Sequence, residues 1–77
     1  MWYVYIINCT KDNTLYTGIT NNLEKRIAAH NNGTGARYTK GRGPVEVIKI
    51  FEVENRSAAL KLECEIKKMK REDKLKL

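Results

Sequence analysis

The fold of this chain is decided by residues 15–30, with the sequence LYTGITNNLEKRIAAH. This stretch predicts a strand that carries Tyr16 and Gly18, then a polar turn, and then a helix over about residues 23–31. Either of the two asparagines before the helix is suited to cap it, because an asparagine side chain accepts hydrogen bonds from the first free amides. Glycine weakens the interior of a strand, so Gly18 predicts a bulge or the close approach of a backbone segment.

Four residues of the predicted helix share one arc of about 100°, namely Leu23, Arg26, Ile27 and His30. Leu23 and Ile27 must face the core. Arg26 and His30 therefore lie on or beside the buried face, where an unpaired charge costs free energy. This polar pair predicts a site under the helix, lined by Tyr16 from the strand before it.

The flanking segments complete an α+β pattern. Residues 2–7, WYVYII, predict a strand that is apolar on both faces and therefore central in a sheet. Residues 45–53 alternate in polarity and predict a third strand, and residues 57–70 predict a second helix with an apolar stripe. Residues 71–77 can form one more short helix. We expect a three-stranded, largely antiparallel sheet flanked by helices, in the order β-β-α-β-α with an optional terminal helix.

Length and charge narrow the class of protein. The chain has 77 residues, so we expect a single domain over residues 1–77 with a modest core. The net charge of +6 favours an anionic partner such as nucleic acid, although a merely solvated basic surface is the alternative. Cys9 and Cys64 have no metal-binding spacing, and no secretory signal or membrane span is recognisable. We therefore expect a reduced, cytoplasmic protein with no membrane partner.

The stretch over residues 31–44 holds four of the five glycines of the chain. Three cations and one aromatic residue are interleaved with them: Arg37, Tyr38, Lys40 and Arg42. The stretch lacks the pattern of a nucleotide-binding P-loop. We interpret it as a clamp that contacts a nucleic-acid backbone, because long irregular segments in small domains are often functional. A solvated connector is the alternative interpretation.

Five positions, taken in order, resemble the signature of the GIY-YIG nuclease family. They are Tyr5 in Tyr3-Val4-Tyr5, Tyr16 in Tyr16-Thr17-Gly18, Arg26 and His30 on the first helix, and Glu63 on the second. The chain departs from the signature where Tyr3 stands for glycine and where Val4 and Thr17 stand for isoleucine. The likeness covers nearly the whole chain and is greatest to the small stand-alone bacterial subgroup. That subgroup is similar to the nuclease subunit of the eukaryotic structure-specific endonuclease.

The resemblance implies a three-stranded antiparallel sheet and a metal-dependent endonuclease that hydrolyses DNA phosphodiesters, with a role in repair or recombination. It implies that Glu63 holds one Mg²⁺ or Mn²⁺ ion, with waters completing the coordination. It further implies that Tyr16 is the general base, that Arg26 grips the phosphate, and that Tyr5 and His30 order the water and the base or share in proton transfer.

Each of these residues also has an ordinary structural explanation. The two tyrosines can be cross-strand core aromatics, and Arg26 can be an amphipathic stem with its head in water. His30 can favourably end a helix, and Glu63 can form an i,i+4 ion pair with Lys67. Two other functions therefore stay open. One is a non-catalytic nucleic-acid-binding module of the same fold, and the other is a protein–protein module that serves a partner complex.

Overall fold

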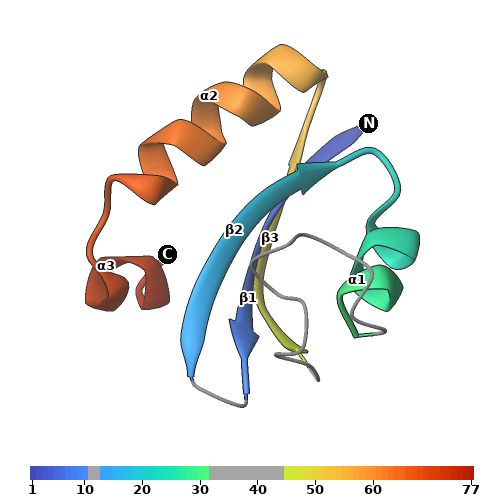
Figure 1. Cartoon of the computed structure of the whole chain (residues 1–77). Helices are drawn as coiled ribbons and strands as arrows, with labels where there is room; N and C mark the ends of the chain where they lie inside the picture. The colour runs from blue at the N-terminus through green and yellow to red at the C-terminus, as the bar shows by residue number, and fades with distance from the viewer. Residues whose placement is uncertain (11–12, 32–44) are drawn as a thin grey trace.

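The computed structural model describes residues 1–10, 13–31 and 45–77. Its elements are β1 (Trp2–Cys9), β2 (Thr14–Thr20), α1 (Leu23–Asn31), β3 (Val45–Val53), α2 (Arg56–Lys67) and α3 (Arg71–Leu75), as Figure 1 shows. The α+β class and the order β-β-α-β-α-α are thereby confirmed.

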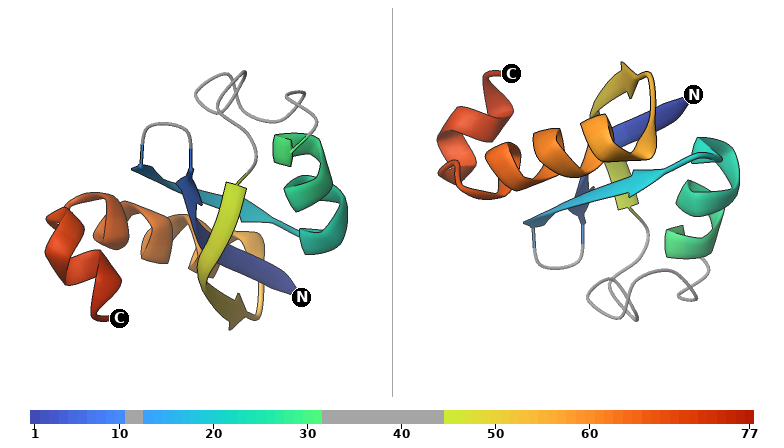
Figure 2. Two further views of the ribbon diagram at one scale, coloured as in Figure 1. Left: turned by 90° about the horizontal axis from the view of Figure 1, so that it is seen from below. Right: turned by 90° about the horizontal axis from the view of Figure 1, so that it is seen from above.

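The sheet is antiparallel throughout, and β1 is its central strand in the order β2-β1-β3. Successive side chains of a strand point to opposite faces. Val4 and Ile6 of β1 accordingly pack with α2, whereas Tyr5 points to the face on which His30 of α1 lies. Figures 1 and 2 show α1 and α2 on opposite sides of the sheet. The apolar character of both faces of β1 thus has its reason in a helix on each side.

The main hydrophobic core lies between the sheet and α2, where Val4 and Ile6 meet Ala59 and Ile66 of the helix. The side chain of Asn55 caps α2 by accepting a hydrogen bond from the backbone N–H of Ala58 at 2.9 Å. The helix had been expected over residues 57–70, but it ends at Lys67. The backbone N–H of Lys68 donates to the carbonyls of Glu65 and Ile66 in the last turn, and α3 begins at Arg71.

Strand β3 departs from the strict alternation expected of it. Its pairing with β1 shifts between Ile6 and Ile7. Such a bulge places two residues opposite one and changes which side chains share a face. Ile48 therefore joins the core, whereas Val47 is 39% exposed and Ile50 is 43% exposed.

The C-terminal helix α3 is tied to the turn between β1 and β2. A terminal nitrogen of Arg71, Nη1, donates a hydrogen bond to the backbone carbonyl of Asn13 at 2.6 Å. Asn13 has a φ of 57°, and its side-chain oxygen accepts a bond from Asn8 at 2.9 Å. Asparagine tolerates this left-handed conformation better than most residues do. The last element of the chain therefore closes against the first hairpin.

Candidate active site

The site begins where β2 turns into α1. The Asn22 side chain accepts a hydrogen bond from the Lys25 amide at 3.2 Å, and the Asn22 carbonyl accepts one from the Arg26 amide at 3.1 Å. The hydroxyl of Thr20 accepts a bond from the Asn22 amide at 3.0 Å. Of the two asparagines suited to cap the helix, Asn22 therefore does so. This start directs Arg26 and His30, one turn apart, toward the sheet.

Four of the five residues named from the sequence meet under α1: Tyr5, Tyr16, Arg26 and His30. The Tyr5 hydroxyl lies 2.9 Å from Nε2 of His30 and accepts a hydrogen bond from Nε of Arg26 at 3.3 Å. The Tyr16 ring centroid lies 5.3 Å from that of His30 and 6.4 Å from that of Tyr5. Tyr5 and His30 are fully buried, whereas Tyr16 and Arg26 are half-buried. Solvent and substrate thus reach the cluster through Tyr16 and Arg26.

Gly18 gives the Tyr5 ring room to cross β2. The two residues are direct partners across the β1–β2 ladder. A Cβ atom built on Gly18 would stand 2.5 Å from the Tyr5 hydroxyl oxygen and 3.0 Å from Cε1 of Tyr16. The sequence predicts a bulge or a close backbone approach at this glycine, whereas the group that approaches it is the side chain of Tyr5, and the pairing of β1 with β2 is regular.

Burial helps to determine which groups of this cluster carry a proton. It lowers the pKa of His30, and the charge of Arg26 lowers it further, so His30 is neutral at pH 7. Burial also raises the pKa of Tyr5, although the hydrogen bond and the charge of Arg26 act in the opposite direction. The Arg26 guanidinium is always protonated and can only donate. The consistent arrangement is that Arg26 donates to the Tyr5 oxygen and the Tyr5 hydroxyl donates to Nε2 of His30. The histidine proton then sits on Nδ1.

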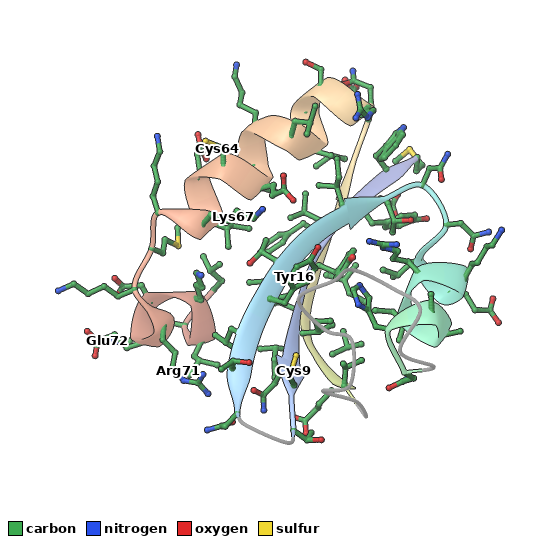
Figure 3. All side chains as sticks on the ribbon, viewed as in Figure 1. Cys9, Tyr16, Cys64, Lys67, Arg71 and Glu72 are labelled. Atoms are coloured by element: carbon green, nitrogen blue, oxygen red, sulfur yellow. The ribbon has the colours of Figure 1, made fainter. Side chains whose placement is uncertain are left out.

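Glu63, the fifth residue, is not among the residues that meet under α1, because its helix α2 lies on the other side of the sheet. It lies on α2, and β2, which carries Tyr16, runs between α2 and α1 (Figure 3). Its side chain is 19% exposed and pairs with Lys67 at 3.5 Å between carboxylate and ammonium. Its negative charge still contributes to the raised pKa of Tyr5, as the weakest of several causes after burial. The i,i+4 pair considered from the sequence is thus present, and the charge of Glu63 also reaches the tyrosine cluster.

The donor set fits a hard divalent cation that keeps much of its water. Over residues 1–10, 13–31 and 45–77, no three histidine, cysteine or acidic side chains gather into a closed metal cage. A single carboxylate can still serve, because Mg²⁺ is commonly bound by one or two carboxylates together with waters. Glu63 meets this requirement, because it is an oxygen donor with part of its side chain in solvent.

Three further findings concern the rest of the chain. The four positions expected to contact nucleic acid, Arg37, Tyr38, Lys40 and Arg42, lie outside the described residues. A pocket of about 180 Å³ beside Arg26, bordered by Lys25, was not foreseen. Its only signal in the sequence is the pair of adjacent cations at the start of the helix. In the part of the chain that the structure describes, no helix has the length and apolar character needed to cross a membrane.

The comparisons with known proteins agree on the family of this chain. The family model described as the GIY-YIG catalytic domain matches residues 1–76. The chain is 58% identical to a UPF0213 protein of Clostridium perfringens over all of its length and 82% of that relative. It is 52% identical to a UPF0213 protein of Oceanobacillus iheyensis, over 97% of the chain and 86% of the relative. The solution NMR structure of a UPF0213 protein from Bacillus halodurans has 40% sequence identity and a TM-score of 0.58, and covers 96% of this chain and 79% of its own.

Proposed function

Because this chain belongs to the GIY-YIG catalytic domain family, whose membership implies nuclease-type activity, we propose that it is a metal-dependent endonuclease that hydrolyses DNA phosphodiesters. The observation that carries the proposal is the buried Tyr5–His30 pair, which holds Arg26 beside Tyr16 at a solvent-reachable edge. A basic chain with a net charge of +6 suits such a substrate. We propose a cytoplasmic role in DNA repair or recombination. Branched and flapped DNAs arise in these processes and are therefore the substrates to test first.

The half-buried residues contact the substrate. In its phenolate form, Tyr16 accepts the proton of the attacking water as general base and becomes the neutral phenol. Arg26 is hydrogen-bonded to Tyr5 and Tyr16, and the remaining N–H groups of its planar guanidinium suit a phosphate. The positive charge then offsets the negative charge that develops on the phosphate in the transition state.

The buried residues act through Arg26 and are positioning residues. Neutral His30 accepts the Tyr5 proton, which leaves the Tyr5 oxygen free to receive the Arg26 N–H. The guanidinium is thereby held in one orientation before substrate arrives. Preorganised donors of this kind avoid the cost of reorganisation during the reaction.

Glu63 would hold the divalent ion, Mg²⁺ or Mn²⁺, which when bound supplies a Lewis acid and neutralises phosphate charge. In the absence of the ion, the Lys67 ammonium partly offsets the charge of the carboxylate at 3.5 Å. The repulsion between this carboxylate and DNA is therefore reduced but not removed.

The decisive experiment replaces Glu63→Gln, which keeps the volume and removes the charge. Cleavage of branched, flapped, single-stranded and duplex DNAs with Mg²⁺ should be lost. Metal-free DNA affinity should stay equal or tighten, because a repulsive charge is gone. The melting temperature should change little, since an exposed i,i+4 pair is worth only about 0.3–0.5 kcal/mol.

Glu65→Gln is the matched control, because it makes the same change at an exposed position of the same helix. It should cleave as the wild type does. Full activity of Glu63→Gln would refute the metal-ligand role. DNA binding by the wild type without cleavage in any divalent metal would instead favour the binding-module alternative.

A further inference from the structure

A pocket opens next to the tyrosine cluster, and Arg26 of the cluster is one of the residues that line it. Its volume is about 180 Å³, and its lining comes from the end of β2 and the first turns of α1: Thr20, Asn21, Asn22, Lys25, Arg26 and Ala29. Two of these side chains are cations, three are polar and one is a single methyl group. None is acidic. Arg26 belongs both to this pocket and to the hydrogen-bonded cluster with Tyr5.

The cations of the pocket are not neutralised inside the described part of the chain. Arg26 bonds to the neutral Tyr5 hydroxyl, and no ion pair of Lys25 or Arg26 with a carboxylate occurs among residues 1–10, 13–31 and 45–77. Two adjacent cations in a concave, partly polar site attract an anion with several oxygen acceptors. At the start of the helix, the Asn22 side chain accepts the Lys25 amide proton, so the attraction is attributed to the two side-chain cations alone.

We propose that this pocket binds a backbone phosphate of the nucleic-acid strand, next to the phosphate that is cleaved. The inference rests on the proposed function for the identity of the strand. Arg26 lines the pocket and is also hydrogen-bonded to Tyr5 of the cluster, so one residue borders both phosphates and Lys25 contacts the second. Phosphate contacts of this kind fix the register of the strand without reading its sequence. Because the side chain of Ala29 is only a methyl group, the pocket has room for the phosphate.

The first test places a negative charge in the pocket. Ala29→Glu should weaken metal-free binding to a fluorescently labelled duplex more than tenfold. Ala28→Glu is the matched control, because it adds the same charge to the same helix at an exposed position that does not line the pocket. It should weaken binding less than threefold. Equal losses in the two variants would overturn the proposal.

The second test removes the cation and guards against misfolding of Ala29→Glu. Lys25→Gln should lower the slope of log affinity against log salt by about 0.9, the value for one lost phosphate contact on duplex DNA. Lys61→Gln, on the exposed side of α2, should leave the slope unchanged. An unchanged slope in Lys25→Gln would mean that the pocket holds no phosphate of the strand.

A titration with inorganic phosphate separates this inference from the proposed function. In amide NMR spectra, phosphate should move the Thr20, Asn21 and Lys25 signals, and sodium chloride at equal ionic strength should not. Shifts in the wild type that disappear in Ala29→Glu support the site even if no DNA is cleaved. Cleavage of DNA by a wild type whose pocket signals do not respond leaves the nuclease standing and overturns the pocket.

Discussion

At the scale of single residues, Tyr5 is the side chain on which the site depends. It receives a hydrogen bond from Arg26, contacts His30 at 2.9 Å and lies across Gly18. A phenol that is buried and held from both sides has one orientation, so a change in any of its neighbours is transmitted to Arg26. Two predictions at this scale follow from its surroundings.

Gly18→Ala should disturb the site and the fold together. The new methyl group would stand 2.5 Å from the Tyr5 hydroxyl oxygen and 2.7 Å from its Cζ, so the ring must shift. Overpacking of this kind costs about 1–3 kcal/mol. We expect a melting temperature lower by several degrees and a loss of cleavage larger than the loss of folded protein. The double variant with Tyr5→Phe should recover part of the stability but none of the activity. A Gly18→Ala protein that melts and cleaves like the wild type would contradict this packing.

His30 should make stability depend on pH in one window. It is the one histidine of the chain, and burial followed by the charge of Arg26 lowers its pKa below the ordinary value of 6.5. Below about pH 6.5 the unfolded chain takes up a proton that the native protein resists. Stability is therefore complete above that pH and is lost as the pH falls toward the native pKa. Urea unfolding between pH 8 and pH 5 should show this loss in the wild type, whereas in His30→Gln the same window should be flat. Identical slopes would mean that His30 titrates as in the unfolded chain.

At the scale of elements, the predictable parts are those in which local pattern and tertiary packing agree. The central position of β1 followed from its two apolar faces, and the start of α1 followed from an asparagine cap. The faces of β3 could not be predicted, because the bulge opposite Ile6 and Ile7 is a property of the pairing and not of the strand. The sequence also predicts the end of α2 at residue 70, later than its actual end at Lys67, because the helical pattern of polar and apolar residues continues where the chain turns.

A site of Arg26 and His30 beside Tyr16 could be anticipated, because a polar pair on a buried helix face requires partners, whereas Tyr5 is named only through the family resemblance. The pocket could not be anticipated, because Ala29 is apolar and small and Lys25 occupies a position typical of a lysine that is simply exposed to solvent. The position of Glu63 behind β2 depends on how α2 crosses the sheet, which no local pattern specifies.

Thr17 of β2 should be a site where substitution stabilises the protein. It is 3% exposed, and among the described residues its hydroxyl has no hydrogen-bond partner. A buried polar group without a partner costs about 1–3 kcal/mol, so Thr17→Val, which keeps the shape, should gain about 1 kcal/mol. For a domain of this size that is roughly 4–8 °C in melting temperature.

Thr20→Val is the matched control on the same strand, with the opposite sign expected. The Thr20 hydroxyl accepts from the Asn22 amide at 3.0 Å and donates to the Asn22 carbonyl at 3.2 Å. Its loss removes the partner of the Asn22 amide, although the Asn22 carbonyl keeps its bond from the Arg26 amide, and should lower the melting temperature. A Thr17→Val protein that is destabilised as much as Thr20→Val would mean that Thr17 has a partner after all.

At the scale of the whole molecule, one strand carries both stability and the candidate site. Val4 and Ile6 of β1 hold α2 against the sheet, and Tyr5 between them points to α1. Glu63 and Arg26 therefore come from helices on opposite sides, and their relative position depends on the packing of the entire domain. A ligand that contacts groups from both sides binds only the folded state.

Metal binding should consequently raise the melting temperature, and Glu63 should be required for the rise. An ion that binds only the native state stabilises it by RT ln(1 + [L]/Kd), which is about 1.4 kcal/mol at ten times Kd. That free energy corresponds to roughly 6–11 °C for a domain of this size. Thermal unfolding with increasing Mn²⁺ should show the rise in the wild type and not in Glu63→Gln, whereas Glu65→Gln should behave as the wild type. Lys67→Met should need less Mn²⁺ for the same rise, because the ammonium at 3.5 Å competes with the ion for the carboxylate. An equal rise in wild type and Glu63→Gln would place the ion elsewhere on the protein.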